Sequence, residues 1–425
     1  MASSLLMTLF FSVDTYWIGT RVGATGLAAA STAVFWIWLL VSIAEMVNVG
    51  LTAVASRRYG EGLPREASRL AGDALLLAFA LGLTCTTVGL PLLPRLFGLM
   101  QTPAEVTALG TRYMATYLLG APLIFGFFAL DAAFRAAGDT RTPFLLLVAS
   151  VGVTLVIDPI LIVGWGPVPA LGMTGAAIAT ISTRAVALVL GLFIVGRRGV
   201  VRFGRPVWAD LLSVCRIGLP TAVTGVVFSL IYVALTRTTT HFGVPALAAM
   251  GIGHRVESWL YMVGVGFGAA TAAIVGQNLG AGRVDRAEHA GWIAVGFCSA
   301  LGVLASMIQL ARPEWFASLF SSDPAVIAEG ARYLRIAALS QLAVCAEIVL
   351  EGALGGAGYT LVPMLTSTAF TAARIPLAVW AAARYGSAGI WWTISLTAVC
   401  RAGGMVVIWR TGRWKRLDGV NASTA

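Results

Sequence analysis

Four groups of residues occur twice in this chain, and the second copy always follows the first by 220 residues. The longest group runs from Asp131 to Pro143 and matches the run from Glu351 to Pro363. The shorter groups begin at Val22 and Phe242, at Gly60 and Gly280, and at Gly110 and Gly330. Many membrane transporters consist of duplicated apolar halves with the substrate path between them. The repeat therefore predicts two similar halves.

Most of the chain is too apolar for a water-soluble fold. Hydrophobic residues make up 58% of it and charged residues 11%, whereas roughly 25% of an ordinary soluble protein is charged. An apolar stretch of about 20 residues crosses a bilayer as one helix. We expect twelve such helices, six in each half, near residues 1–20, 31–55, 70–93, 109–134, 143–164, 172–195, 209–236, 246–277, 287–310, 328–356, 361–383 and 387–410. The predicted fold class is an all-α polytopic membrane protein with two six-helix bundles.

The polar stretches between these helices set the predicted domain boundaries. A six-helix bundle over 1–196 is followed by an arginine-rich linker over 197–206, a second bundle over 207–412 and a tail over 413–425. All but one of the basic residues are arginines, and most lie in alternate connections. Because positively charged loops face the cytoplasm, we expect a multi-pass protein of the cytoplasmic (inner) membrane with both termini and the linker inside the cell.

The remaining composition argues against catalysis. The five cysteines and three histidines are scattered through the chain and lack the spacing of a metal site. The net charge of +10 follows the loop asymmetry, so it predicts no nucleic-acid partner. We predict that the protein is not an enzyme, has no cofactor or metal, and has small-molecule substrates and the lipid bilayer as its partners.

Two aspartates lie inside apolar windows. Asp14 belongs to the first window, and Asp158 in the fifth directly precedes Pro159. An ionisable group at membrane depth is costly, which makes it a functional hypothesis by default. Proline has no backbone N–H, so we expect the helix to be loosened beside Asp158. Two carboxylates in one half can share a proton or a cation; the alternative is that both only cap or bridge helices.

Four further residues are candidates for substrate binding. Glu45 lies near Asn48 in the second window, and Glu347 is the best acidic candidate in the second half. Trp36 also lies in the second window, and the face of its ring would attract a flat organic cation. The alternatives are that Glu45 lies close to the membrane surface and that the tryptophan belongs to an interfacial belt.

Other charged residues in or beside the windows have plainer interpretations. Asp131 and Glu351 occupy equivalent positions in the repeat, where capping of a helix or pairing with a nearby arginine accounts for them. Pairing with carboxylates or with carbonyls at helix ends accounts for Arg184, Arg255, Glu257, Arg374 and Arg401. The sequence does not specify which pairs form.

Six segments carry a resemblance to a known family. They run over Ser12–Gly19, Gly26–Ala30, Phe134–Pro143, Ile157–Pro159, Leu171–Thr180 and Ile274–Gly282. In their order and spacing the chain resembles the multidrug and toxic compound extrusion (MATE) family over essentially its whole length. The resemblance implies a monomer in which two six-helix bundles form a V-shaped cleft. It also implies export of organic cations driven by an inward flow of protons or sodium ions.

The resemblance also implies roles for single residues. Asp14 and Asp158 match the coupling carboxylates of the DinF-like branch of that family, and Thr180 matches a hydroxyl of the same pocket. Thr154 stands where that branch often has asparagine, and the segment Phe228–Tyr232 holds no carboxylate where sodium-coupled relatives have one. The implied ion-coupling set is therefore Asp14, Asp158, Thr154 and Thr180, with the proton favoured over sodium.

These expectations combine into one predicted function. The chain is expected to be a cation-coupled, in the first place proton-coupled, antiporter that exports organic cationic drugs or toxic metabolites across the cytoplasmic membrane. The alternative is a lipid-linked oligosaccharide or polysaccharide flippase of the same superfamily, which would need a cavity lined by Arg or Lys for phosphates. The repeat adds one expectation about the gene, because the entry run that ends at Pro220 would have its counterpart before Met1. We expect a short basic-amphipathic stretch to be encoded there.

Overall fold

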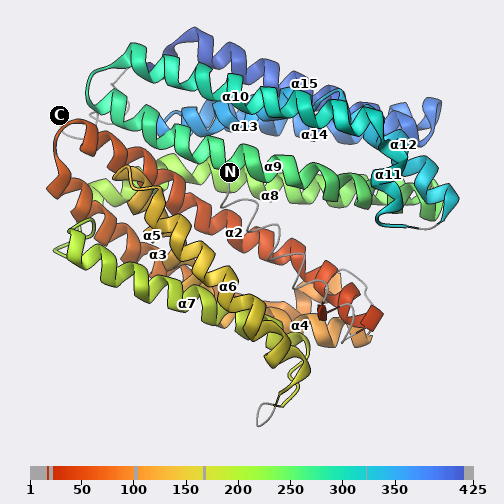
Figure 1. Ribbon diagram of the computed structural model, residues 1–425, viewed down its shortest axis with the longest axis horizontal. Coiled ribbons are helices and arrows are strands. Elements are labelled where there is room, and N and C mark those ends of the chain that lie inside the picture. Colours follow the sequence, from red (N-terminus) through yellow and green to blue (C-terminus); the bar gives the residue numbers. More distant parts are fainter. Residues whose placement is uncertain (1–16, 19–22, 100–103, 166–168, 322, 416–425) are drawn as a thin grey trace. The chain divides into compact units, whose positions relative to one another are not determined.

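The computed structural model describes residues 17–18, 23–99, 104–165, 169–321 and 323–415, and their regular structure is helical (Figure 1). Nine of the described helices are long and apolar enough to cross a bilayer, and two bent helix pairs raise the number of candidate spans to as many as eleven. The predicted all-α polytopic fold is confirmed for the described part of the chain. The first predicted helix, near 1–20, lies almost wholly outside it.

The helices follow one another in two series. The first series is α2 (Gly23–Gly60), α3 (Pro64–Leu99), α4 (Ala104–Leu119), α5 (Ala121–Ala136), α6 (Arg141–Val163) and α7 (Met173–Arg198). The second series is α8 (Trp208–Thr240), α9 (Gly243–Gly280), α10 (Val284–Ala311), α11 (Pro313–Ser318), α12 (Pro324–Ala338), α13 (Gln341–Gly356), α14 (Leu361–Tyr385), α15 (Ser387–Thr411) and the short 3-10 helix η2 (Arg413–Lys415).

The helices pack into two compact units. The described residues up to 222, with 280–282, form the first, here called the N-unit. The described residues of 223–279 and from 283 onward form the second, the C-unit. In the N-unit, α2 packs against α3, α4 and α5, and α6 packs against α7. In the C-unit, α13 packs against α10 and α15, and α14 packs against α15. The division between the units falls inside α8, and the predicted domain boundaries at 196, 206 and 412 stay predictions.

The sequence repeat reappears as a repeat of helix boundaries. Helices α2 and α9 have the same length and begin 220 residues apart, at Gly23 and Gly243, and the same holds for α5 and α13 at Ala121 and Gln341. The starts of α3 and α10, of α4 and α12, and of α6 and α14 also differ by 220 residues. The two series therefore repeat one order of helices, although their sequences share few residues.

Repeated glycines end equivalent helices in the same way. Gly138 after α5 and Gly358 after α13 have φ of 85° and 76°, a backbone conformation that costs a residue with a Cβ roughly 1–2 kcal/mol. The next backbone N–H then reaches back to a free carbonyl of the last turn, from Asp139 to Phe134 at 3.0 Å and from Tyr359 to Leu354 at 2.9 Å. These bonds explain why the repeat is easiest to see in these turns.

Two of the predicted helices are bent. The windows 109–134 and 328–356 read as single helices, but α4 and α5 meet at 52° and α12 and α13 at 55°. In the first pair, Pro122 cannot donate a hydrogen bond to the carbonyl of Leu118, which opens the helix there. Leu342 takes the equivalent position in the second pair, so a proline is not required for this bend.

Each bend exposes a carbonyl, and a hydroxyl from a neighbouring helix bonds to it. The Thr86 hydroxyl of α3 donates to Leu118 O at 2.5 Å, and the Ser306 hydroxyl of α10 donates to Ala338 O at 2.6 Å. The two donors are 220 residues apart, as are the two acceptors. Because a backbone carbonyl in an apolar medium needs a donor from within the protein, these hydroxyls stabilise the bend in both halves.

The loop between α5 and α6 is held by Asp139. Its Oδ1 accepts hydrogen bonds from the backbone N–H groups of Arg141 at 3.1 Å and Thr142 at 2.9 Å. Its Oδ2 accepts from the Thr142 hydroxyl and from Arg198 Nη1, both at 2.6 Å. Burial acts to raise the pKa of Asp139, but the hydrogen bonds from Thr142 and Arg141 and the charge of Arg198 outweigh burial and hold that pKa below its ordinary value. The carboxylate thus ties the end of α7 to this loop.

We expect Thr86→Val and Ser306→Ala each to destabilise the protein by about 1–3 kcal/mol, because each leaves a buried carbonyl without a donor. Thr84→Val is the control, since Thr84 is exposed and its hydroxyl bonds only to Ala80 O in its own helix. Thermal unfolding of the purified proteins in detergent ranks the stabilities of the three variants. Equal melting temperatures for Thr86→Val and Thr84→Val would contradict the assigned role.

We expect Asp139→Asn to lower the melting temperature more at pH 7 than at pH 3. The amide oxygen can still accept the two backbone hydrogen bonds, whereas the amide nitrogen cannot accept from the Thr142 hydroxyl. Only the part of the difference that depends on pH therefore reports the charge. A carboxylate whose pKa is lower in the folded than in the unfolded protein stabilises the fold above the unfolded pKa of about 3.9. This stabilisation is lost as the pH falls through the lower pKa of the folded protein. Arg198 is 56% exposed, so solvent screening limits the expected difference to about 1–2 °C. A difference that is independent of pH would rule out the charge as its cause.

Candidate functional site

Asp158 is a fully buried carboxylate in the N-unit, with an exposed fraction of 0%. It lies in α6 beside Pro159, which is inside the helix and leaves the carbonyl one turn earlier without its helical donor. The buried Thr154 lies one turn before Asp158, and its hydroxyl donates to Ser150 O at 2.9 Å. The sequence thus places an acid, a hydroxyl and a loosened backbone in one helical segment.

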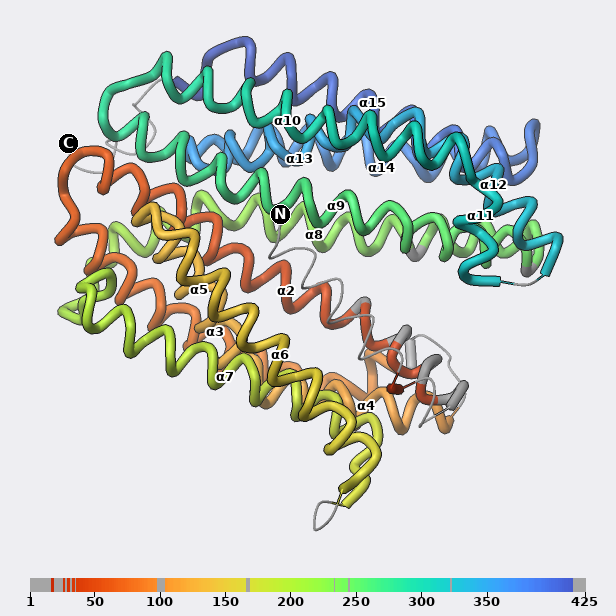
Figure 2. Tube along the Cα trace, in the orientation of Figure 1, coloured from red at the N-terminus to blue at the C-terminus, as the bar shows by residue number. Residues whose placement is uncertain are grey.

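Helix α7 lies beside this segment of α6 (Figure 2). A Cβ at Gly175 would lie 2.4 Å from Leu161 O, so only glycine allows the two helices to approach this closely. Backbone N–H groups at the start of α7 also bond to α6, from Leu171 to Leu161 O at 3.0 Å. Thr180, the third predicted member of the ion-coupling set, lies further along α7 and is 7% exposed.

A second polar group in the N-unit lies along α2. Asn48 Nδ2 donates to Glu45 Oε1 at 3.5 Å, and the Thr52 hydroxyl donates to Asn48 Oδ1 at 3.5 Å. Arg135 of α5 forms an ion pair with Asp131 and lies close enough to Glu45 for their charges to interact. The ion pair agrees with the prediction that Asp131 binds a nearby arginine.

Trp36, the third candidate on α2, is partly buried. Its indole Nε1 is inaccessible to solvent and has no hydrogen-bond partner among the described residues. A buried indole N–H normally has an acceptor. The indole nitrogen therefore lies inside the protein, and the role of Trp36 in substrate binding stays a prediction.

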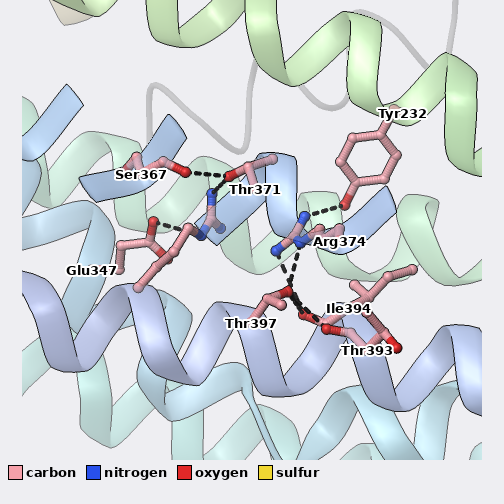
Figure 3. A network of polar contacts seen from close by, with 9 residues as sticks. Tyr232, Glu347, Ser367, Thr371, Arg374, Thr393, Ile394 and Thr397 are labelled. Carbon is pink, nitrogen blue, oxygen red and sulfur yellow. Dashed lines mark hydrogen bonds and ion pairs between the residues drawn. The ribbon is translucent and has the colours of Figure 1, made fainter. Parts of the chain in front are cut away.

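In the C-unit, Glu347 of α13 is buried and paired. Its Oε1 lies 3.2 Å from Nε of Arg401 in α15, and Arg401 Nη1 donates to the Thr371 hydroxyl of α14 at 3.2 Å. Figure 3 labels Glu347 and Thr371. Side-chain exposure is 4% for Glu347 and 12% for Arg401. The expectation that Arg401 pairs with a carboxylate or a carbonyl is confirmed, and three helices are joined through it.

A second arginine is buried on α14, one turn after Thr371. Arg374 is 1% exposed, and its Nε donates to the Thr397 hydroxyl at 2.7 Å (Figure 3). Its two terminal nitrogens donate to the Tyr232 hydroxyl at 3.4 Å and to Ile394 O at 3.5 Å. The hydrogen-bond partners of this guanidinium are therefore hydroxyls and a carbonyl rather than a carboxylate.

The two halves differ in charge at equivalent places. The interval of 220 residues places Arg374 where the N-unit has Thr154, and Ala378 where it has Asp158. The N-unit therefore carries a buried acid in α6, and the C-unit carries a buried base in α14. The buried aspartate of α6 therefore has no acidic counterpart at the equivalent position of α14.

An aromatic cluster lies beside Arg374 in the C-unit. The ring of His254 lies 4.7 Å from that of Tyr232 and 6.3 Å from that of Tyr333. The Tyr333 hydroxyl donates to Glu257 Oε2 at 2.9 Å, and its ring lies 4.8 Å from that of Trp391. Aromatic faces combined with a carboxylate are chemistry that binds organic cations.

The structure brings together only some of the predicted site residues. Asp14 lies outside the described residues. Thr154 and Asp158 share α6, Thr180 lies on the adjacent α7, and Glu45 bonds directly to Asn48. Glu347 belongs to the other unit. Sequence reasoning missed the grouping of Arg374 with Tyr232 and Thr397, for which an arginine inside the window 361–383 was the available signal.

We expect Arg401→Met to destabilise the protein by about 3–5 kcal/mol, because it removes the ion-pair partner of the buried Glu347. The double variant Glu347→Gln/Arg401→Met removes both charges and should be more stable than the single variant. Arg335→Met is the control, since its ion pair with Glu314 is more than half exposed and such pairs contribute about 1 kcal/mol or less. Melting temperatures in detergent test the order, and a double variant less stable than Arg401→Met would contradict it.

Comparison with known proteins adds the family. The family model MatE matches residues 1–160 and 220–380. The chain is 31% identical over 332 residues to an FAD transporter of Shewanella oneidensis, which covers 76% of this chain and 73% of that protein. It is also 31% identical over 407 residues to a probable multidrug resistance protein NorM of Deinococcus radiodurans, with 92% and 88% covered.

The fold is also found among solved structures. A MATE transporter of Vibrio cholerae in a bent form superposes with a TM-score of 0.87 at 22% identity, over 96% of this chain and 93% of that chain. The family match covers most of both repeats, and the chain has the apolar helices of an integral multi-pass membrane protein. The chain belongs to the MatE family of membrane transporters.

Proposed function

We propose that this protein is a proton-coupled antiporter that exports organic cationic drugs or toxic metabolites across the cytoplasmic membrane. The observation that carries the proposal is Asp158, a carboxylate with 0% exposure in a membrane-spanning helix. A carboxylate held at membrane depth is costly when charged, and a proton removes that cost. Family membership supports drug export, since several relatives are named multidrug resistance proteins.

Coupling follows from different affinities in two states. A proton bound at Asp158, with Thr154 and Thr180 beside it and Asp14 as the proposed second carboxylate, favours one orientation of the substrate path. A bound drug favours the other orientation, because each ligand binds the two states with different affinity. Neither ligand needs to touch the other for transport to be coupled.

The proposed substrate contacts are Glu45, Asn48, Trp36 and Glu347. The hydrogen bond between Asn48 and Glu45 orients the carboxylate, and Trp36 offers an aromatic face for a flat cation. We propose that the protein works as a monomer with both termini and the linker in the cytoplasm, as the arginine distribution favours.

One observation favours a second substrate class. A relative at 31% identity is named an FAD transporter, and FAD carries a diphosphate. Arg374 and Arg401 bring two guanidinium groups into the C-unit, and guanidinium binds phosphate through paired hydrogen bonds. Anionic nucleotides are therefore the alternative cargo to organic cations.

The experiment uses the full chain in liposomes, with ethidium, norfloxacin and FAD as separate cargoes. We expect a proton gradient alone to drive ethidium or norfloxacin movement and Asp158→Asn to abolish it, because the amide keeps the volume but removes the titratable group. Glu314→Gln, an exposed acid paired with Arg335, is the control and should transport normally. Size-exclusion profiles establish that each variant is folded.

The other outcomes are distinct. Transport that requires sodium at a constant proton gradient would overturn the proton assignment. Wild-type transport by Asp158→Asn would overturn the coupling site. Movement of FAD in place of the cations would favour the second substrate class, and Asp14→Asn, tested in parallel, extends the measurement to the other proposed carboxylate.

A further inference from the structure

We infer that the linker between the two helix series forms a binding surface for the headgroups of anionic phospholipids. This linker surface consists of Arg69 at the start of α3, Arg202, Phe203 and Arg205 of the linker, and Trp208 at the start of α8. The inference concerns lipid binding and does not depend on the transported substrate.

The backbone of the linker is fixed on α3. Arg202 N donates to Ser68 O at 2.9 Å, and the Ser68 hydroxyl donates to Gly199 O at 2.8 Å. At the far end, Val207 N donates to the buried Asp73 Oδ2 at 3.1 Å. A segment bonded at both ends presents its side chains in fixed directions, so less entropy is lost when a ligand binds.

Close packing brings the arginines of the two elements together. A Cβ at Gly72 would lie 2.3 Å from Arg202 O, and one at Gly204 would lie 3.4 Å from Arg69 Nε. Arg69 also donates a hydrogen bond to Arg205 O. Arg69, Arg202 and Arg205 are all exposed, so three guanidinium groups lie on one small surface.

The carboxylates near this surface already have other partners. Glu66 and Asp210 both pair with Arg58, and Glu61 pairs with Arg57. Asp73 is 1% exposed. None of the three arginines of the linker surface forms an ion pair with a described carboxylate. The surface therefore carries positive charge that this part of the protein does not neutralise.

Two other basic residues at the same predicted membrane face have carboxylate partners. Arg198 pairs with Asp139, and Lys415 pairs with Glu288. The three arginines of the linker surface are distinguished by their grouping on and beside one backbone segment that is bonded at both ends.

Apolar groups beside the arginines place the surface at the membrane boundary. Phe203 is 63% exposed, Trp208 77% and Leu212 69%. Leu212 follows Trp208 by one turn of α8, while Leu211 on another face is buried. Candidate spans begin at Pro64 and Trp208, and tryptophan is enriched where helices enter the headgroup region. Phosphodiester groups lie at this depth, and arginine binds them through two hydrogen bonds.

The test measures lipid binding to the full chain in detergent by native mass spectrometry, with phosphatidylglycerol and phosphatidylcholine as probes. We expect the triple variant Arg69→Gln/Arg202→Gln/Arg205→Gln to bind phosphatidylglycerol roughly a hundredfold more weakly, since each arginine near the headgroups contributes about fivefold. Binding of phosphatidylcholine should not change. Added salt should weaken phosphatidylglycerol binding to the unmodified protein.

Two further variants make the result decisive. Arg202→Gln/Arg205→Gln leaves the hydrogen bond from Arg69 to the linker in place, so an expected loss of roughly 25-fold there cannot be due to a displaced linker. The triple variant Arg112→Gln/Arg237→Gln/Arg312→Gln removes three exposed arginines elsewhere and should bind as the unmodified protein does. Equal losses in the two triple variants, or unchanged phosphatidylglycerol binding in the double variant, would overturn the inference.

Discussion

The hydrogen-bonding demand of backbone carbonyls in an apolar medium shapes both halves of this protein. At the bend between α4 and α5 the carbonyl of Leu118 receives a hydroxyl from Thr86, and at the equivalent bend the carbonyl of Ala338 receives one from Ser306. A bend without such a donor would leave a buried carbonyl without a partner, which costs several kcal/mol in a membrane. The hydroxyl is kept although the proline is not, since Leu342 replaces Pro122. The donor is thus the feature that both bends share.

The sequence predicted what depends on local pattern. The repeat, the apolar windows and the acid at Asp158 follow from composition and spacing, and the described residues form helices in the windows from 31–55 onward. The hydroxyl bonds at the bends could not be predicted, because Thr86 is 32 residues from Leu118 and a threonine in an apolar window resembles any small residue. The contacts of Arg374 with Tyr232 and Thr397 join three helices and depend on packing that no local pattern records. Asp14 lies outside the described residues, so its place in the site stays a prediction.

Duplication followed by divergence explains the charge difference between the halves. Helix α6 carries Asp158 with a hydroxyl one turn earlier, whereas α14 has Ala378 and Arg374 at the equivalent positions. The two units repeat one order of helices, and the side chains that differ in charge at these positions are buried in both. At these positions the first half has a titratable acid, and the second half has a permanent positive charge. The two halves thus share one order of helices and differ in the charge buried at equivalent positions of α6 and α14.

The division between the units falls within α8, between residues 222 and 223, rather than in the linker. The first turns of α8 pack closely on α2, since a Cβ at Gly50 would lie 2.1 Å from Val214 O and one at Gly218 1.8 Å from Met46 O. Pro220 lies inside the helix just before the division and provides no N–H to stiffen it. The linker therefore lies wholly within the N-unit, and the chain next enters the C-unit inside a helix, close to the place where Pro220 leaves one helical hydrogen bond unmade.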